Sequence, residues 1–494
     1  MFEAAELGQE VSKEEYAKRE PVLRQALLKA QYALLNKPDF PVIVLVGGMD
    51  GGGKGETVNK LHEWMDPRHI RTAAFGEPTE EERQRPPMWR FWRALPGKGH
   101  IGMLFGSWYT EPIASRVDHG LGSKAFLREI EEIRHFERML VAEGALILKF
   151  WFHLSKKAQK KRTAELQDDP LTRWKVTPRD LAHLKTYDRF RDAAEVMLRE
   201  TSTGEAPWTI VDGTDARYRS LAVGNTLLEA LNGRLKNPAP PPTEAPAPLQ
   251  RPLATKGARN VITSLDYEAS VGDKEYDERL AELQGRLAVL LRKKRFKERS
   301  LVLAFEGSDA AGKGGAIRRV TAAMDSRSYS VVPIAAPTEE ERAQPYLWRF
   351  WRNVPAHGRT AIFDRSWYGR VLVERVEKFA AVPDWMRAYH EINQFEAQLS
   401  DAGAIVLKFW LAITKEEQLK RFKAREKVEF KRFKITEDDW RNRKKWGDYE
   451  QAVCDMVERT GTEVAPWHLI PANDKQYARI EVLKAICGAL EQRL

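Results

Sequence analysis

The sequence has few cysteines. Its 494 residues include two, Cys454 and Cys487, and both stand among apolar neighbours in helix-like contexts. Two thiols cannot staple a disulfide-rich fold. We therefore expect them to be core thiols in a reducing cytoplasm, rather than a disulfide or metal ligands.

Long hydrophobic runs are also missing. Apolar stretches such as FPVIVLV at 40–46 are much shorter than the ~20 residues that a membrane-spanning helix needs. The first residues, MFEAAELGQEVSKEE, contain no basic segment followed by an apolar stretch, so we expect no signal peptide. These absences argue against a membrane protein and favour a cytoplasmic one.

Charged residues are abundant, with an excess of one sign. The chain has 81 Lys and Arg against 71 Asp and Glu, a formal net charge of +10. Such a balance favours an anionic partner without identifying it. The apolar content of 43% is enough for an ordinary core in each half of the chain.

The chain repeats itself at one fixed spacing. Lys313 follows Lys54 by 259 positions (313 − 54 = 259), and the same offset aligns several longer stretches. These are PTEEER at 78–83 and 337–342, WRFWR at 89–93 and 348–352, and LKFW at 148–151 and 407–410. Because this period exceeds any solenoid unit, we predict two homologous domains, residues 1–236 and 260–494.

A proline-rich segment separates the two repeats. Residues 237–252, NPAPPPTEAPAPLQRP, contain seven prolines in sixteen positions. Proline removes backbone donors and fixes φ, so we predict an extended linker over 237–259. A rigid arm packed on the face of a domain is the alternative.

Each repeat carries a glycine-rich loop between an apolar run and a helical pattern. GMDGGGKGE occupies 48–56, and GSDAAGKGG occupies 307–315. Gly307, Gly312 and Lys313 match the G-x-x-x-x-G-K pattern, in which backbone N–H groups and the lysine hold phosphates. The alternative, a turn with a surface lysine, is disfavoured because the motif occurs twice in the same context.

The loop departs from the usual pattern at the position that binds Mg²⁺. Gly314 stands where a Ser or Thr hydroxyl normally contacts the metal. A metal-dependent phosphotransferase then needs oxygen ligands from elsewhere. We predict Asp309, inside the loop, and Asp364, at the end of the apolar run TAIF, as these ligands.

Several segments of the second repeat, taken in order, resemble the polyphosphate kinase 2 family. They are GSDAAGKGG, APTEEE, LWRFW, FDRSWYGRV, KFWLAITKEEQLKR and APWHLIPANDKQYAR. The resemblance covers nearly all of both halves. It implies two tandem P-loop kinase-like α/β/α domains with parallel sheets, helical lids and Mg²⁺. It also implies transfer of phosphate from inorganic polyphosphate to AMP, giving ADP.

Polyphosphate has no base or sugar to recognise, so its binding requires mainly positive charge. Residues 408–445, where the lid is expected, hold fourteen Lys and Arg against seven Asp and Glu. The predicted contacts in this stretch are Arg421, Arg425, Lys431, Arg432 and Lys434. A solvated helix face is the alternative for each. Nucleic acid is a rival anion, but we find no nucleic-acid motif and expect none to bind.

The remaining roles follow from phosphoryl transfer. The AMP phosphate is largely ionised at neutral pH, so catalysis needs positioning and charge neutralisation more than a general base. We assign the phosphates to Lys313 and the amides of the glycine loop, and the metal and acceptor to Asp309 and Asp364. The predicted phosphate clamps are Arg365, Arg370, Arg375 and Lys475, with ion-paired structural roles as the alternative for Arg370 and Arg375.

The first repeat lacks four of these groups. At the same offset, Phe105 replaces Asp364 and Gly106 replaces Arg365. Likewise, Glu111 replaces Arg370 and Ala216 replaces Lys475. Phenylalanine cannot bind Mg²⁺ and glutamate repels a polyanion, so we predict a degenerate domain. It would stabilise the second repeat across an interface like that of a one-domain dimer, or provide a landing surface for polyphosphate. We accordingly expect either an internal pseudo-dimer or a homo-oligomer.

Other functions remain open from the residues alone. The same fold would also suit phosphorylation of ADP or GDP from polyphosphate. An ATP-dependent P-loop kinase is disfavoured by the missing hydroxyl and by the FDRSWYGR segment. A basic binding module without turnover is disfavoured by the intact set of residues in the second repeat.

Overall fold

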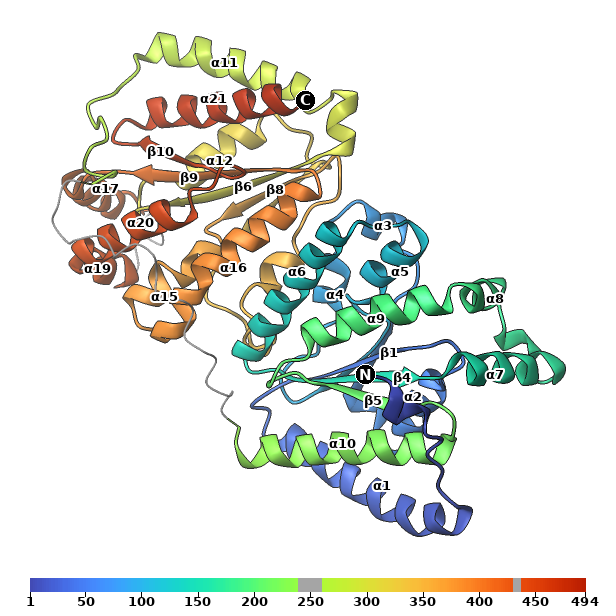
Figure 1. Ribbon diagram of the computed structural model, residues 1–494. Coiled ribbons are helices and arrows are strands. Elements are labelled where there is room, and N and C mark those ends of the chain that lie inside the picture. The colour runs from blue at the N-terminus through green and yellow to red at the C-terminus, as the bar shows by residue number, and fades with distance from the viewer. Residues whose placement is uncertain (239–259, 430–436) are drawn as a thin grey trace. The chain divides into compact units, whose positions relative to one another are not determined.

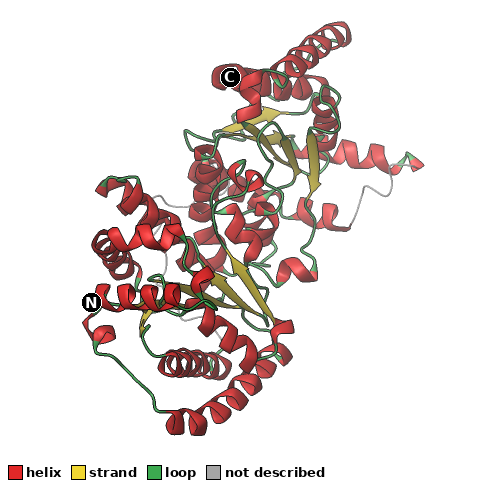
Figure 2. Cartoon of the chain, turned by 90° about the vertical axis from the view of Figure 1, so that its right-hand side faces the viewer, coloured by secondary structure: helices red, strands yellow, loops and turns green. Residues whose placement is uncertain are grey.

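Two five-stranded parallel sheets organise the chain (Figures 1 and 2). The computed structural model describes residues 1–238, 260–429 and 437–494. The first sheet has the order β2-β3-β1-β4-β5 and the second the order β7-β8-β6-β9-β10. The strands are β1 Val42–Gly48, β2 Ile70–Ala74, β3 Ile101–Phe105, β4 Leu146–His153, β5 Trp208–Asp212, β6 Ser300–Gly307, β7 Tyr329–Pro333, β8 Thr360–Asp364, β9 Ala404–Ala412 and β10 Trp467–Pro471.

Helices connect the strands and cover both faces of each sheet. In Figure 1, α11 and α21 lie on one side of the second sheet, and α16 and α20 lie on the other. The first repeat contains α1 Lys13–Asn36, α2 Lys54–Trp64, α3 Glu80–Arg83, α4 Trp89–Ala94, α5 Thr110–Asp118, α6 Ser123–Ala142, α7 Lys156–Asp168, α8 Pro178–Lys185, α9 Tyr187–Thr201 and α10 Ala216–Lys236, with 3-10 turns η1 Glu3–Glu6, η2 Pro67–His69 and η3 Arg173–Lys175.

The helices of the second repeat follow the same order. They are α11 Asp273–Leu290, α12 Lys313–Thr321, α13 Glu339–Arg342, α14 Trp348–Trp351, α15 Val373–Val376, α16 Val382–Asp401, α17 Lys415–Glu426, α19 Glu437–Lys444, α20 Trp446–Thr460 and α21 Lys475–Arg493, with η4 Lys294–Glu298 and η5 Trp367–Arg370. Among the described residues, no helix has both the length and the apolar character needed to cross a membrane.

The central strands are buried on both faces, which explains their continuous apolar sequences. In β6, every residue from Ser300 to Glu306 is buried, and in β9 all nine residues are. Parallel strands covered by helices on both sides require such runs. Cys454 and Cys487 are free and buried, as predicted.

The core of each repeat contains the same buried polar network. It includes the tryptophan and tyrosine of the Ser-Trp-Tyr segments at 107–109 and 366–368. The fully buried Lys408 Nζ donates to Glu396 Oε2 at 2.8 Å, to Tyr368 Oη at 2.9 Å and to the Thr460 carbonyl at 2.6 Å. Trp367 Nε1 also donates to Glu396, at 2.9 Å. A buried charge pair is stable only when its hydrogen bonds are complete, and here they hold the Trp-Tyr pair in place.

The first repeat reproduces this network. Lys149 Nζ donates to Glu137 Oε2 at 2.7 Å, to Tyr109 Oη at 3.2 Å and to the Thr201 carbonyl at 2.7 Å. Trp108 Nε1 donates to Glu137 at 3.0 Å. The tryptophan and tyrosine of this motif are buried in both repeats and therefore serve packing.

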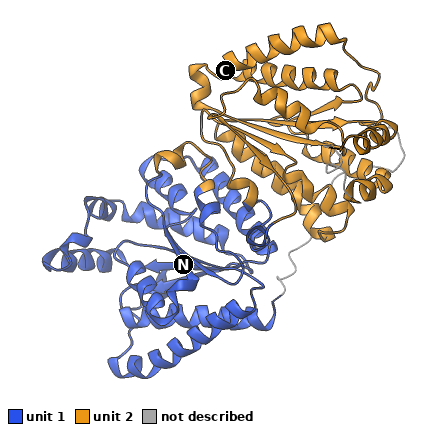
Figure 3. Ribbon diagram, turned by 180° about the vertical axis from the view of Figure 1, so that it is seen from behind, with its two compact units in different colours: residues 1–78, 90–243, 338–348 blue, residues 79–89, 244–337, 349–494 orange. Residues whose placement is uncertain are grey.

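The chain forms two compact units, each with a short segment from the other repeat (Figure 3). Unit 1 comprises residues 1–78, 90–243 and 338–348, and unit 2 comprises 79–89, 244–337 and 349–494. The short segments contain α13 and α3, which carry the repeated PTEEER sequence.

The parallel α/β architecture and its duplication are confirmed. The strand order, with β1 and β6 central, places the loops after these strands at the carboxyl edge of each sheet. In open parallel sheets, ligands bind at this edge. The linker predicted over 237–259 lies, except for its first two residues, outside the described part of the chain.

Candidate active site

The glycine loop of the second repeat joins the end of β6 to the start of α12. Gly307 has φ +149°, and a side chain there would lie 2.5 Å from the Leu411 carbonyl oxygen, so only glycine fits. Gly312 is the left-handed N-cap of α12, with φ +110°. Lys313 follows and turns its Nζ back to donate to the Gly307 carbonyl at 2.7 Å, and Gly314 is the second helical residue. The loop thus joins a strand to a helix N-terminus, which is the local structure that the motif predicts.

Three carboxylates and one arginine surround the half-buried Lys313. Burial, then the charge of Arg365, lowers the pKa of Lys313, and Asp309, Glu306 and Asp364 act against this lowering. Asp364 ends β8 directly beside Phe305 of β6. Arg365 Nη2 contacts Asp309 Oδ1 at 3.4 Å. The predicted residues Asp309, Lys313, Asp364 and Arg365 therefore come together at one end of the sheet.

Arg365 occupies a backbone conformation that side chains rarely adopt. Its φ is +64°, and the aligned Gly106 of the first repeat has φ +71°. A non-glycine residue in this region costs about 1–3 kcal/mol and persists where the surroundings enforce it, often at functional sites. The strand end of the second repeat thus keeps an arginine at a position where glycine is the unstrained choice.

Glu306 is a site residue that the sequence analysis missed. It is buried immediately before Gly307, and this burial raises its pKa. Its Oε1 accepts hydrogen bonds from Ser366 N at 2.7 Å and Ser366 Oγ at 2.8 Å, which ties the glycine loop to the segment after β8. The aligned residue is Gly47. An acid within an otherwise apolar strand, absent from the other copy, was the available signal.

Arg421 supports the glycine loop. The arginine is 5% exposed, and each of its three nitrogens donates to the protein. Its acceptors are Glu417 Oε1 and the carbonyls of Ala310, Ala311, Ala472 and Asn473, at 2.7–3.1 Å. A guanidinium has five N–H donors, so these five contacts occupy all of them. The structure therefore does not support the predicted contact between Arg421 and phosphate.

A basic group lies beside the start of α12 and α21. Burial lowers the pKa of Lys475, and the charges of Arg421, Arg479 and Arg425 lower it further. The Arg479 guanidinium lies 3.4 Å from the position that a side chain at Gly315 would take. Lys475 and Arg425 therefore lie in one basic group, and their contact with phosphate stays a prediction. Arg479 is a member of this group that the sequence analysis missed.

Arg370 and Arg375 are ion-paired within the protein. Arg370 Nε lies 2.9 Å from Glu374, and Arg375 Nη2 lies 2.7 Å from Asp455. The Arg375 guanidinium also stacks 4.5 Å from the Trp385 ring centre. These contacts favour the structural alternative for both arginines over the phosphate clamps. Three further predicted contacts lie outside the described residues: Lys431, Arg432 and Lys434.

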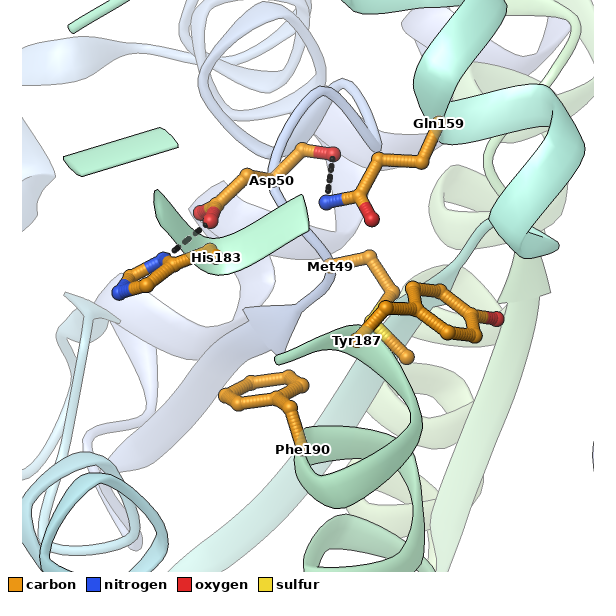
Figure 4. A pocket seen from close by; sticks show the side chains of 6 residues that line it. All are labelled: Met49, Asp50, Gln159, His183, Tyr187 and Phe190. Atoms are coloured by element: carbon orange, nitrogen blue, oxygen red, sulfur yellow. Dashed lines mark hydrogen bonds and ion pairs between the residues drawn. The ribbon is translucent and has the colours of Figure 1, made fainter. Parts of the chain in front are cut away.

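The first repeat places a histidine against the acid of its loop (Figure 4). His183 Nδ1 lies 2.6 Å from Asp50 Oδ2, and Gln159 Nε2 donates to the Asp50 carbonyl at 3.2 Å. Tyr187 and Phe190 close the pocket around this pair. In the second repeat, the residue aligned with His183 is Asn442. Its Nδ2 donates to Asp309 Oδ2 at 2.9 Å.

Arg219 covers the glycine loop of the first repeat. A Cβ atom added at Gly53 would lie 2.2 Å from the Arg219 guanidinium. A Cβ atom added at Gly312 would meet no other described part of the chain within 4 Å, apart from its neighbours in sequence and its own helix. Arg219 Nη2 donates to Glu56 at 2.6 Å, and Arg162 lies 3.4 Å from the same carboxylate. Glu56, an exposed acid of the same repeat, thus neutralises cations that would otherwise be available to a phosphate.

The Asp50–His183 pair predicts a pH-dependent stability of the first repeat. The hydrogen bond to Asp50 raises the pKa of His183, so the contribution of His183 to stability is lost as pH rises through this raised value. Burial raises the pKa of Asp50, but His183 and Lys54 lower it by more. The contribution of Asp50 to stability is therefore lost only as pH falls through this lowered value. Arg179 and Asp118 also act on His183, with opposite signs. The pair should therefore stabilise the first repeat most between pH 3.8 and pH 6.5, the ordinary pKa values of aspartate and histidine.

Thermal melts of wild type and His183→Asn would test this expectation. The variant should lower the melting temperature of the first repeat at about pH 5.5 and change it less at about pH 8.5, where the imidazole is neutral. An equal loss at both values would contradict the assignment.

Comparisons with known proteins identify the family of the chain. The family model "Polyphosphate kinase 2 (PPK2)" matches residues 10–239 and again residues 270–494. The chain is 55% identical over 493 residues to the polyphosphate:AMP phosphotransferase of Pseudomonas aeruginosa, covering 99% of each chain. It is 40% identical over 475 residues to that of Acinetobacter johnsonii, covering 94% of this chain and 95% of the relative.

A solved structure resembles the whole chain. A crystal structure described as a polyphosphate kinase 2 from Pseudomonas aeruginosa superposes with a TM-score of 0.88 and 52% identity, covering 100% of this chain and 99% of the other. Both halves match one family model, and the similarity to relatives runs through the whole length. The chain therefore belongs to the polyphosphate kinase 2 family, with two copies of the family domain in tandem.

Proposed function

We propose that the protein transfers the terminal phosphate of inorganic polyphosphate to AMP, giving ADP, and that its second repeat carries the reaction. Relatives similar over nearly the full length are named polyphosphate:AMP phosphotransferases. The observation that carries the assignment to the second repeat is the grouping of Lys313, Asp309, Asp364 and Arg365 around an open glycine loop. The aligned strand end of the first repeat, Phe105 and Gly106, has neither acid nor base.

The reaction requires positioning and neutralisation of charge. Loop N–H groups and Lys313 would hold the donor phosphates, and Arg365, 54% exposed at the strand end, can reach a phosphate in solution. The AMP phosphate oxygen is already largely ionised at neutral pH, so it can attack without a base. Holding donor and acceptor in line then supplies most of the acceleration.

The two aspartates fit a magnesium ion that also binds phosphate. Asp309 is 13% exposed and Asp364 is half-buried, and both supply the hard oxygen ligands that Mg²⁺ prefers. No group of three or more acidic, histidine or cysteine residues in the described ranges is arranged to hold a metal by itself. Mg²⁺ commonly uses one or two carboxylates together with substrate phosphates, so this set is sufficient. When bound, the ion would neutralise charge on the phosphate oxygens.

The donor chain would be held mainly by charge. Arg479 lies near the start of α12, and Lys475 and Arg425 belong to the same basic group, which would neutralise successive phosphates. We propose that residues 260–494 form the catalytic part. Residues 1–236, joined to it by 237–259, form a non-catalytic part that acts as the permanent partner of an internal pseudo-dimer.

We also propose that the protein works in the cytoplasm, where AMP is found.

A product assay on the full-length protein tests the function. Supplying AMP with polyphosphate and Mg²⁺ should give ADP, and replacing polyphosphate with ATP should give little. Turnover of ADP or GDP but not AMP would shift the assignment to a diphosphate acceptor. ADP formed only with ATP would refute use of polyphosphate.

A further inference from the structure

A buried glutamate joins three elements of the second repeat. Glu377 lies directly after α15, and its side chain is only 4% exposed. Lys445 Nζ donates to its Oε2 at 2.7 Å, Arg441 Nε lies 3.1 Å from the same oxygen, and Tyr449 Oη lies 3.3 Å from Oε1. A carboxylate taken out of water is costly unless paired and hydrogen-bonded. These contacts therefore fasten α19 and the start of α20 to the end of α15.

The same contacts extend to the glycine loop. Tyr449 Oη lies 3.0 Å from Asn442 Oδ1, so its proton can go to Asn442 or to Glu377. Burial, then the negative charge of Glu377, raises the pKa of Tyr449, and the hydroxyl stays protonated and able to donate. Asn442 Nδ2 donates to Asp309 Oδ2 at 2.9 Å. A continuous chain of polar contacts thus runs from Glu377 to Asp309.

The amide leaves Asp309 with free capacity to bind a cation. A carboxylate accepts about four hydrogen bonds or ligands, and the contacts here are Asn442 on one oxygen and the longer Arg365 contact on the other. Asn442 is uncharged, so it orients the carboxylate without neutralising it. In the first repeat, His183 instead places an ionisable ring 2.6 Å from Asp50.

The first repeat does not keep this chain of polar contacts. The aligned residues, subtracting 259 from each number, are Asp118, Ala182, His183, Thr186 and Phe190. Asp118 retains an acid, but it is exposed at the end of α5. Alanine and phenylalanine cannot pair with a carboxylate. The polar chain is thus found in the repeat that also keeps the acid and base after its third strand.

We infer that Glu377 is a positioning residue for the reaction. It anchors α19 and α20 so that the Asn442 amide fixes the orientation of Asp309, one of the two carboxylates proposed to hold Mg²⁺. This inference rests on the proposed function. Residues that orient a metal ligand typically change metal affinity or activity 10–100-fold when replaced, which gives the expected scale.

The test compares two matched substitutions in the full-length protein. Glu377→Gln keeps the size of the side chain and removes the charge that holds Arg441 and Lys445. We expect about tenfold weaker Mg²⁺ binding, measured by calorimetric titration of the AMP-bound protein, and about tenfold lower kcat. Asp118→Asn, the same change at the exposed aligned position, should leave both values as in the wild type.

A second substitution separates positioning from folding. Tyr449→Phe removes only the hydroxyl that links Glu377 to Asn442, and it should also weaken Mg²⁺ binding while the protein remains folded by circular dichroism. Unchanged Mg²⁺ binding in both variants would overturn the inference, even if their melting temperatures fall. If the wild type binds Mg²⁺ but does not phosphorylate AMP, the proposed function fails, and the titrations still decide the role of Glu377.

Discussion

Replacing Lys313 with alanine should lower kcat for AMP phosphorylation about a thousandfold in the full-length protein. Its Nζ lies inside the glycine loop, 2.7 Å from the Gly307 carbonyl and among the carboxylates proposed to hold Mg²⁺. A single cation that stabilises a transferring phosphoryl group is worth about 10³-fold or more in rate. A steady-state assay of ADP formation from polyphosphate would measure the loss.

Lys54→Ala is the matched control. Lys54 turns back in the same way, donating to the Gly48 carbonyl at 2.7 Å, but the loop around it is covered by Arg219. We expect a change of kcat below about twofold, because the lysine serves local structure there and not the reaction. Similar losses in both variants would mean that both repeats turn over substrate.

Transplanting the strand end of the first repeat into the second should abolish turnover without unfolding the domain. The variant Asp364→Phe with Arg365→Gly removes one proposed metal ligand and one phosphate-facing base. It also places glycine at φ +64°, where it relieves backbone strain. The exposed Arg365–Asp309 contact contributes little to stability. We therefore expect the melting temperature to stay the same or rise by about 2 °C, while activity falls below detection.

The reverse exchange should not create a second active site. In Phe105→Asp with Gly106→Arg, the new side chain at 106 would begin 2.9 Å from the Phe75 carbonyl oxygen. Ala216 would still stand in place of Lys475, and Arg219 would still cover the glycine loop. Near-normal turnover of the Asp364/Arg365 variant would refute the assignment of the metal site. New activity in the reverse variant would refute the expectation that the first repeat lacks more than this acid and base.

The fold and the position of the glycine loop could be predicted from the sequence because both depend on local patterns. Gly307, Gly312 and Lys313 are close in sequence and act through backbone geometry. Asp364 could be placed because the ends of parallel strands meet at one edge. The fixed offset between repeats then distinguished the copy with an acid and base from the one without.

The sequence could not reveal contacts made at long range. Arg375 pairs with Asp455, eighty positions later, and Arg421 reaches the loop carbonyls by folding back across the site. From the sequence alone, Arg375 and Arg421 are both candidates to bind phosphate, because their partners in the fold are not apparent. The strained φ of Arg365 is equally invisible, because no residue type signals it.

The buried network beneath Ser-Trp-Tyr has a consequence for how this protein tolerates mutation. Lys149 and Lys408 make the same contacts in their own repeats, although only one repeat is proposed to react. A library scored for protein abundance should therefore reject substitutions at Lys149 and Lys408 alike. Scored for growth that depends on the enzyme, the same library should additionally reject changes at Lys313 while tolerating them at Lys54. The duplicated chain thus contains its own reference copy, in which selection for folding is recorded separately from selection for chemistry.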